Sequence, residues 1–225
     1  MSDINDFAVP GGIKPDYWDA ARDHLIASDR ILRDLIPRLG PGHLEGRGDA
    51  LTTLARSIVG QQISVKAAQA VWDRAVLVLE KHRQDGDGHL WCEPLLRAEA
   101  AVLREAGLSL RKIEYTKHLA QRHADGLIDV ARWEGMDDEA VIQDLITLRG
   151  VGRWTAEMFL IFHLLRPNVL PLDDVGLIKG VSRNWFAGEP VSRSDVRELA
   201  GAWTPYSSVA TWYIWRSLDP LPVAY

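Results

Sequence analysis

The chain has 225 residues, of which 47% are hydrophobic and 25% charged, and its formal net charge at pH 7 is −5. This is the composition of a folded globular protein. The single cysteine, Cys92, excludes an internal disulfide and any four-cysteine zinc site or iron–sulfur cluster. No apolar run approaches the roughly 18 residues of a membrane span, and no secretion signal opens the chain, so we expect a cytoplasmic protein with no membrane partner.

The charge is distributed unevenly along the chain. Residues 146–185 carry five basic and three acidic side chains, so this segment is positive within an acidic protein. Its basic residues are Arg149, Arg153, Arg166, Lys179 and Arg183. The net charge of the whole chain argues against a nucleic-acid binder, but a local basic segment predicts modest, salt-sensitive binding of an anionic partner.

The spacing of apolar residues and the helix caps predict an all-α chain of roughly ten helices. Residues 1–15 are expected to form an extended lead-in, and the glycine-rich residues 40–48 to separate two lobes. Strand patterns are nearly absent. Expected N-caps are Asp49, Ser64, Ser109, Asp137 and Ser192. The main expected helices are Asp16–Leu39, 49–58, 64–82, Glu93–Ala106, Leu110–Ala124, Asp138–Leu148, one from Ser192 and Tyr206–Leu218.

The stretch from Asp144 to Lys179 organises the chain. A helix that ends near Arg149 is followed by the tight turn Gly150-Val151-Gly152 and by a second helix that begins near Trp154. Both glycines can take positive φ and leave backbone amides uncovered. Amides at the start of a helix, together with the helix dipole, suit a phosphate. A plain connector is the alternative, because short glycine motifs often match by chance.

Two segments favour the phosphate-binding interpretation. Leu148–Ala156 reads LRGVGRWTA, and Leu170–Asp174 reads LPLDD. Together they resemble the helix-hairpin-helix plus Gly/Pro-Asp signature of a DNA base-excision glycosylase superfamily, most closely its alkylbase branch, 3-methyladenine DNA glycosylase II. The resemblance spans about Ala50 to Trp215. It implies one catalytic unit over 1–225 with two helical lobes, an active-site cleft between them and no N-terminal β domain. Lobe A would be 48–165 with the hairpin, and lobe B 1–47 plus 166–225.

The paired carboxylates Asp173 and Asp174 lie just before a predicted helix start. One aspartate is sufficient for an N-cap, and in the resembling family the aspartate before this helix is catalytic. The resemblance assigns that role to Asp174 and leaves Asp173 as a helix cap or as a partner of Asp174. A carboxylate in a poorly hydrated site stabilises the oxocarbenium-like sugar that forms when an N-glycosidic bond breaks, and it orients the attacking water.

A base must leave the helical stack before an enzyme can reach its bond to the sugar. The resemblance places Trp154, Met158, Tyr206 and Trp215 around the extruded base. Met158 stands where relatives have an aromatic residue, and Ser207 where they usually have arginine, so we expect a wider or less polar pocket. Aromatic rings attract a cationic base by on the order of 1–2 kcal/mol, which predicts release of 3-methyladenine, 7-methylguanine and similar bases. For any single tryptophan, core packing is the more common use.

Contacts to double-stranded DNA are expected from the hairpin and from Gly60-Gln61-Gln62-Ile63-Ser64, the Gln-Gln loop, which resembles the family's Gly-Gln-Gln-Leu/Ile-Ser element. The family pattern makes Gln62 fill the gap left by a flipped nucleotide, and Ile63 is the alternative wedge, since such wedges are usually apolar. Gln61 could equally satisfy backbone groups at a helix junction. The expected DNA-binding residues are Gln61, Gln62, Ile63, Ser64, Gly150, Val151, Gly152, Arg153 and Thr155.

Relatives bind a monovalent cation at the hairpin through main-chain carbonyls, and the matching residues are Ile146, Leu148 and Val151. These carbonyls are candidates for a structural Na+ or K+, and no cofactor is required. Bifunctional relatives place a lysine at the start of the second hairpin helix. Trp154 stands there, so we predict hydrolysis without lyase activity, by a monomer. The alternatives are a non-enzymatic helix-hairpin-helix module, in which the aspartates only cap a helix, and a glycosylase for a deaminated or oxidised base.

Overall fold

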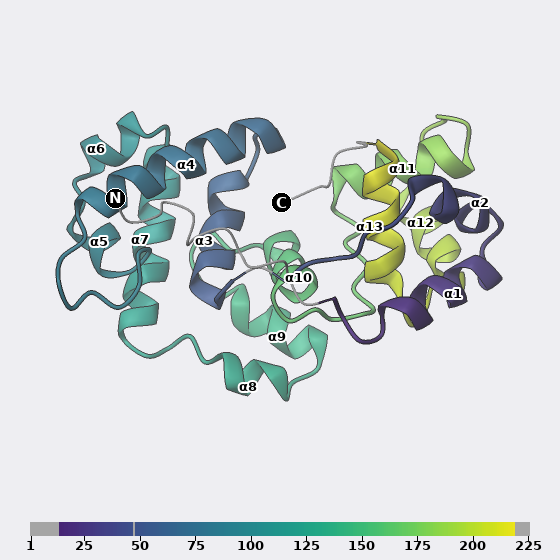
Figure 1. Cartoon of the computed structure of the whole chain (residues 1–225), viewed down its shortest axis with the longest axis horizontal. Coiled ribbons are helices and arrows are strands. Elements are labelled where there is room, and N and C mark those ends of the chain that lie inside the picture. Colours follow the sequence, from purple (N-terminus) through teal and green to yellow (C-terminus); the bar gives the residue numbers. More distant parts are fainter. Residues whose placement is uncertain (1–13, 47, 219–225) are drawn as a thin grey trace. The chain divides into compact units, whose positions relative to one another are not determined.

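The computed structural model describes residues 14–46 and 48–218, and these residues form helices and turns without any strand (Figure 1). The all-α prediction is therefore confirmed for this part of the chain. The lead-in expected over residues 1–15 lies almost entirely outside it. None of the helices in the described ranges is long and apolar enough to cross a membrane.

The described residues divide into two compact units. Unit 1 takes in residues 14–46 and 160–218, and unit 2 takes in residues 48–159. The first division falls at the end of the glycine-rich connector. The second falls inside helix α10 (Arg153–Phe162), earlier than the expected residue 165. The reason is that the last turn of α10 packs within unit 1, where Phe162 stacks on Trp215 with 5.9 Å between ring centroids.

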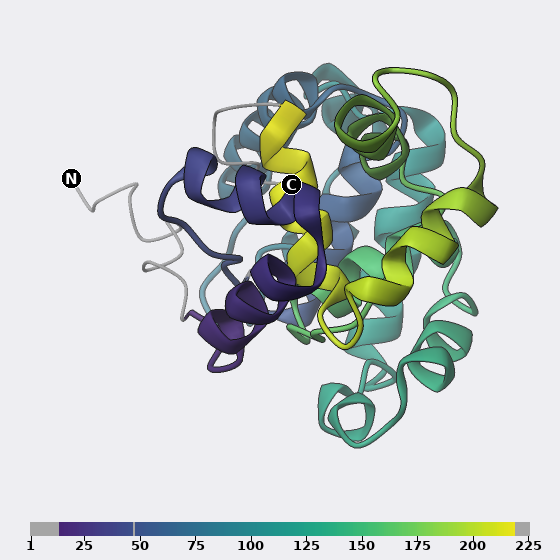
Figure 2. The same cartoon turned by 90° about the vertical axis from the view of Figure 1, so that its right-hand side faces the viewer.

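Unit 1 is organised around helix α13 (Ser207–Leu218). Residues 207–215 of this helix are all buried, as expected for a helix that is apolar on most faces. Helix α13 packs against α11, α1 and α2, and Figure 2 shows α13 in yellow beside the dark N-terminal helices. The other helices of unit 1 are α1 (Trp18–Ser28), α2 (Arg30–Leu39), α11 (Val175–Trp185), α12 (Arg193–Leu199) and the 3-10 helix η1 (Ala200–Ala202).

Two glycines of α11 allow α13 to pack closely against it. A Cβ at Gly180 would lie 2.2 Å from the Cγ2 of Ile214. One turn earlier, a Cβ at Gly176 would lie 3.0 Å from the Cδ1 of Trp215. Residues four positions apart share one face of a helix. The two glycines therefore leave one face of α11 without side chains, and α13 occupies that space.

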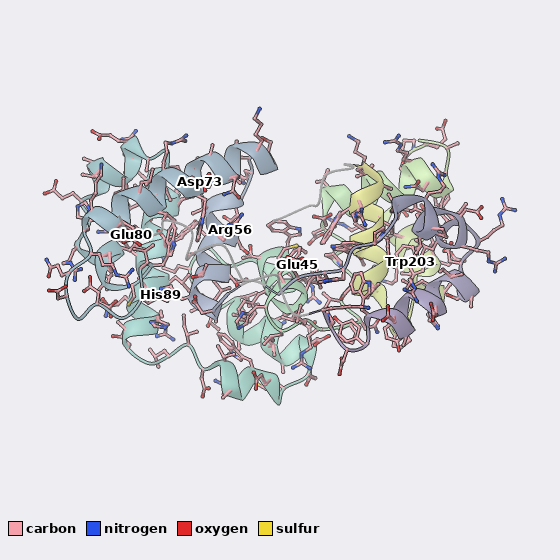
Figure 3. The ribbon with its side chains drawn as sticks, in the orientation of Figure 1. Glu45, Arg56, Asp73, Glu80, His89 and Trp203 are labelled. Carbon is pink, nitrogen blue, oxygen red and sulfur yellow. The ribbon has the colours of Figure 1, made fainter. Side chains whose placement is uncertain are left out.

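Asp29 joins the N-terminal helices to the rest of unit 1. It caps α2, and its Oδ1 accepts from the backbone N–H groups of Ile31 and Leu32 at 2.8 and 3.0 Å. Its Oδ2 accepts from the indole nitrogens of Trp185 and Trp203 at 3.2 and 3.0 Å. Trp203 is fully buried among the helices of unit 1 (Figure 3). Because each carboxylate oxygen accepts two N–H groups, the buried charge is fully hydrogen-bonded.

Unit 2 is organised around helix α3, which packs against α4 and α7 (Figure 1). The caps predicted at Asp49, Ser64 and Ser109 are confirmed, because each side chain accepts from a backbone N–H in the first turn of its helix. The helices that lie wholly in unit 2 are α3 (Ala50–Gly60), α4 (Val65–Lys81), α5 (Glu93–Arg97), α6 (Ala100–Glu105), α7 (Leu110–Ala124), α8 (Val130–Glu134) and α9 (Asp138–Leu145).

Aromatic side chains fill the core beneath α4. Trp72 of α4 stacks on Trp91 with 4.3 Å between ring centroids. Arg56 lies on α3 (Figure 3), and its guanidinium is 5.3 Å from the centroid of the Trp72 ring. This cation–π contact joins α3 to α4, so the two helices on either side of the Gln-Gln loop are held together by side chains as well as by the loop.

Three helices differ from the expected set. The helix expected over Asp16–Leu39 is broken at Asp29, whose side chain caps a second helix. The helix expected over Glu93–Ala106 is two short helices separated by two extended residues. The short helix α8 was not expected, because Trp133 is the one buried residue within it and gives no periodic pattern.

Candidate functional site

Helices α9 and α10 are joined by residues 146–152, which form the predicted hairpin. Asp137 caps α9, as expected. Gly150 has a φ of +85°, and a Cβ there would lie 2.3 Å from two ring carbons of Tyr115. The backbone conformation and the packed ring therefore both require glycine at this position.

Gly152, the second glycine of the motif, has a different role. It is exposed, it is not among the residues with positive φ, and a Cβ there would meet nothing within 4 Å. Of the two hairpin glycines, Gly150 uses the positive φ that glycine permits and Gly152 does not. Its carbonyl accepts from the N–H of Ala156 at 3.0 Å, which places it at the start of α10. The first N–H groups of a helix have no acceptor within the helix, so this end of α10 suits an anion.

Both arginines of the hairpin are paired inside unit 2. Arg153 donates to the two oxygens of Glu139 at 3.0 and 2.7 Å and to Glu157 at 3.1 Å. The hydrogen bonds from Arg153 lower the pKa of Glu139 to about 2. Arg149 pairs with Glu114 at 2.6 Å. The positive charge expected here is thus balanced within the protein, and a phosphate at the hairpin would depend on backbone amides unless these pairs open.

Gln61 connects the Gln-Gln loop to the hairpin. Its side-chain amide donates to the carbonyl oxygen of Gly150 at 2.8 Å and to the hydroxyl oxygen of Thr155 at 3.1 Å. Thr155 is 2% exposed. The direct DNA contact expected of Thr155 is corrected by this burial, because its hydroxyl serves an internal hydrogen bond. Gln61 likewise satisfies protein groups, which was the alternative interpretation for this residue.

Gln62 and Ile63 form the exposed tip of the same loop. Gln62 has a φ of +61°, a conformation that is uncommon for residues other than glycine. Ile63 is 40% exposed. Ser64 ends the loop and caps α4, with its hydroxyl accepting from the N–H of Ala67 at 3.3 Å. Both wedge candidates therefore stand at the surface of unit 2.

The carbonyls expected to hold a monovalent cation are those of Ile146, Leu148 and Val151. The carbonyl of Leu148 accepts from the N–H of Val151 at 3.0 Å, which uses one of its two lone pairs. The chemistry of the donor set fits Na+ or K+, which prefer oxygen ligands, and the cation stays a prediction.

Asp174 is the N-cap of α11 and is 7% exposed. Its Oδ1 accepts from the backbone N–H of Leu177 at 2.6 Å and from the indole Nε1–H of Trp215 at 2.7 Å. Val175, the next residue, is 78% exposed. The carboxylate is therefore poorly hydrated and held in one orientation, yet it lies one residue from the surface. These properties suit a group that stabilises a nearby positive charge.

Asp173 is not a helix cap, which was one of the two roles that the resemblance left to it. Its exposed carboxylate pairs with Arg193 at 2.6 Å. Asp174 fills the capping role, because its extended backbone lets the side chain reach the N–H of the third helical residue. Asp174 is thus both the N-cap of α11 and the candidate catalytic carboxylate.

Gly176 allows the contact between Asp174 and Trp215, and the sequence interpretation missed this residue. A Cβ at Gly176 would lie 3.0 Å from the Oδ1 of Asp174 and 3.1 Å from the Nε1 of Trp215. It would push the indole away from the carboxylate. The available signal was the spacing of Gly176 and Gly180 within one predicted helix, where glycine is unfavourable and usually has a packing reason.

Trp215 is 2% exposed and stacks on Phe162, so the expectation that its ring packs on the extruded base is corrected: its indole instead holds Asp174. The other residues expected around the base lie on different elements. Trp154 and Met158 are one turn apart on α10, in unit 2, where Trp154 is partly exposed and Met158 is buried. Tyr206 is in unit 1, and its ring centroid lies 6.4 Å from that of Tyr17 and 5.5 Å from that of His24. Tyr206 therefore packs against the N-terminal part of unit 1.

Ser207, which stands where the resembling family usually has arginine, is buried. Its hydroxyl donates to the Oδ1 of Asn168 at 2.8 Å. The hydroxyl of Ser208 donates to the carbonyl of Arg166 at 2.6 Å. These bonds hold the segment after α10 against the start of α13. Ser207 thus has a structural partner, and the wider or less polar pocket stays a prediction.

Comparison with known proteins places these features in a family. Residues 55–205 match the family described as HhH-GPD superfamily base excision DNA repair protein. DNA-3-methyladenine glycosylase 2 of Escherichia coli is 31% identical over 199 residues, which cover 85% of this chain and 67% of that protein. A Bacillus subtilis relative that is 31% identical over 170 residues is matched over 58% of its own length, so the chain spans little more than half of that protein.

Solved structures are similar over most of the chain. The crystal structure of DNA-3-methyladenine glycosidase from Bacillus halodurans has a TM-score of 0.72 at 34% identity and covers 88% of this chain and 89% of that chain. The Schizosaccharomyces pombe 3-methyladenine DNA glycosylase in complex with abasic DNA has a TM-score of 0.77 at 28% identity, with 88% and 96% covered. The similarity is therefore not confined to the hairpin.

Proposed function

Because the chain belongs to the HhH-GPD superfamily of base excision DNA repair proteins, we propose that it is a DNA glycosylase for alkylated bases. It hydrolyses the N-glycosidic bond of 3-methyladenine, 7-methylguanine and similar bases in double-stranded DNA and leaves an abasic site. The names of the relatives support this substrate class, and one relative is bound to abasic DNA, the product of such a reaction.

The observation that carries the proposal is that Asp174, a buried carboxylate within the residues that match the family, is held by a hydrogen bond from Trp215. A helix cap requires only the bond from the N–H of Leu177. The indole of Trp215 comes from α13 and donates to the same oxygen at 2.7 Å. The carboxylate plane is thereby held by two donors from different helices, which prepares the charge in a defined orientation before substrate arrives.

Asp174 stabilises the sugar while the base leaves. When the C1′–N bond breaks, its electron pair goes to the base and the sugar becomes oxocarbenium-like. A poorly hydrated carboxylate lowers the free energy of that cation. Water then bonds to C1′, and Asp174 accepts the proton that the water loses. An alkylated purine is already cationic, so the departing electron pair neutralises it and no strong general acid is needed.

Trp154, which is partly exposed, selects for positive charge on the base. The face of an indole attracts a desolvated cation by on the order of 1–2 kcal/mol, whereas a neutral base gains only stacking. Met158, one turn from Trp154 on α10, adds a polarizable thioether that packs well against aromatic rings. These side chains recognise the positive charge of a base rather than the hydrogen-bonding groups on one of its edges. We therefore expect several alkylated bases to be substrates.

DNA is held mainly by unit 2. The backbone amides at the start of α10 bind a phosphate, and the exposed tip formed by Gln62 and Ile63 fills the space of the flipped nucleotide. A Na+ or K+ bound to the carbonyls of Ile146, Leu148 and Val151 would add positive charge at the same turn. The protein acts as a monomer, since one copy carries all of these groups.

The reaction stops at hydrolysis. A lyase step requires an amine that forms a Schiff base with the sugar, and the chain has no lysine between Lys117 and Lys179. Reduction with borohydride during turnover should therefore trap no covalent protein–DNA adduct. Appearance of an adduct that depends on borohydride and damaged DNA would contradict this part of the proposal.

Release of free base from duplex DNA that carries 3-methyladenine or 7-methylguanine tests the function directly. Asp174→Asn keeps the size and an acceptor oxygen but removes the charge, so release should fall by about a thousandfold or more. Binding of abasic DNA should persist in the variant. If neither protein releases base while both bind DNA, the chain is a binding module and Asp174 is only a cap.

A further inference from the structure

Gln61 links two segments of unit 2 that are far apart in sequence. It follows the last turn of α3, and both of its side-chain hydrogen bonds go to the hairpin around Gly150 and Thr155. The residues are separated by 89 and 94 positions along the chain. The side-chain NH2 group has two hydrogens, and each has an acceptor here.

The acceptors of Gln61 stand on both sides of the amides that bind phosphate. Gly150 belongs to the turn, and its position is already restricted by the ring of Tyr115. Thr155 lies in the first turn of α10 and is buried. One side chain therefore joins the loop to the turn and to the helix start at once.

The loop that Gln61 anchors ends in an exposed tip. Gln62 follows directly and has a φ of +61°, a conformation that costs on the order of 1 kcal/mol for such a residue. A strained residue persists only where its surroundings determine its conformation. The side-chain hydrogen bonds of Gln61 fix the backbone on one side of the tip, and the helix cap formed by Ser64 fixes it on the other side.

We propose that Gln61 is a positioning residue that couples the wedge tip to the phosphate-binding hairpin. With Gln61 in place, the tip and the hairpin move as one body, so a phosphate bound at α10 sets where Gln62 and Ile63 enter the duplex. Gln61 itself need not touch DNA. The inference rests on the proposed function for its role in base release, but the coupling itself can be measured on DNA that needs no cleavage.

Two substitutions remove the coupling in different ways. Gln61→Ala deletes the amide, and Gln61→Glu keeps the shape but places a carboxylate against two acceptor oxygens. Thr155→Val removes the hydroxyl acceptor with little change of volume. Gln121→Ala is the matched control, because Gln121 is an exposed glutamine of α7 in the same unit and its amide bonds only to Asp125.

The first measurement uses a duplex with a tetrahydrofuran abasic analogue beside 2-aminopurine, whose fluorescence reports wedge insertion. Gln61→Ala and Gln61→Glu should reduce the fluorescence change severalfold, while the dissociation constant for undamaged duplex changes less than about threefold. Single-turnover release of 7-methylguanine should slow by about tenfold, which at about 1.4 kcal/mol per decade is on the order of two neutral hydrogen bonds. Gln61→Ala and Thr155→Val should be non-additive.

The proposal is overturned if Gln61→Ala gives the fluorescence change and release rate of the Gln121→Ala control. It is also overturned if the losses disappear once the unfolded fraction, measured by thermal unfolding, is taken into account. Wild-type protein that releases no base would refute the proposed function instead. In that case the fluorescence comparison on the abasic duplex still decides the role of Gln61.

Discussion

Unit 1 contains two buried aspartates with similar local chemistry, Asp29 and Asp174. Each caps a helix, each is less than a tenth exposed, and each accepts a hydrogen bond from a tryptophan indole. At Asp29 the four donors are divided between the oxygens, and both indoles bond to Oδ2. At Asp174 the capping bond and the indole bond both end on Oδ1.

The comparison shows which features distinguish a structural carboxylate from a candidate reactive one. Burial and an indole donor are common to both aspartates, so neither feature identifies a catalytic group. Asp29 has two protein N–H donors on each oxygen. At Asp174 the bonds from Leu177 and Trp215 both end on Oδ1, and each aspartate is followed by an exposed residue. What separates the two aspartates is their place in the family match, because Asp174 lies within the matched residues 55–205 and Asp29 lies outside them.

The largest expected effect on stability is that of Asp29→Asn. The substitution removes the charge and replaces one acceptor oxygen by an NH2 group, so the donors on that oxygen lose their acceptor. Hydrogen bonds to charged groups contribute roughly 1.5–3 kcal/mol each, and we expect the free energy of unfolding to fall by on the order of 3 kcal/mol. Denaturant titration measures this. Base release per folded molecule should stay near the wild-type rate, and its loss would show that Asp29 does more than join helices.

Gly176→Ala should separate Asp174 from Trp215 without removing either residue. The added Cβ displaces the indole, and losing one hydrogen bond to a carboxylate should slow single-turnover release by about tenfold or more. Stability should change little, because alanine favours the helix over glycine by roughly 0.8–1 kcal/mol and offsets part of the crowding. Gly201→Ala is the control, since a Cβ there meets nothing within 4 Å. Wild-type release by Gly176→Ala would mean that the indole contact is dispensable.

The smallest expected effects come from removing one indole N–H at each aspartate. Trp215→Phe should slow base release by about fivefold to tenfold, through weaker orientation of Asp174. Trp203→Phe should lower the free energy of unfolding by about 1–2 kcal/mol, with release unchanged, because Trp185 still donates to Asp29. Release assays and denaturant titrations on both variants compare the two sites. If both substitutions slowed base release equally, Asp29 and Asp174 would not differ in their contribution to the reaction.

Much of the fold could be predicted because its signals are local. The caps at Asp49, Ser64, Ser109 and Asp137 each accept from an N–H three residues on, so a short window of sequence contains both partners. The break at Asp29 was missed although the same rule applies. Apolar residues continue at helical spacing on both sides of Asp29, so the periodic pattern concealed the cap.

The hairpin shows what a local sequence motif does not predict. The Gly-x-Gly motif marked the turn correctly, but it did not distinguish Gly150, which the ring of Tyr115 and a φ of +85° require, from Gly152, which has open space around it. The count of arginines suggested a positive surface. The structure pairs Arg149 and Arg153 with acidic side chains, whose positions depend on how α7, α9 and α10 pack.

The sequence by itself determined the all-α class, most helix starts and the hairpin, since these follow from residues within a few positions of one another. The choice of Asp174 over Asp173 came from the family resemblance. The tertiary structure alone decided the partners of those residues. Trp215 reaches Asp174 across 41 positions, and Gln61 reaches Gly150 across 89. Such contacts depend on how whole helices approach one another, and the approach of α13 to α11 depends in turn on the missing side chains of Gly176 and Gly180. No short window of sequence contains both members of these pairs.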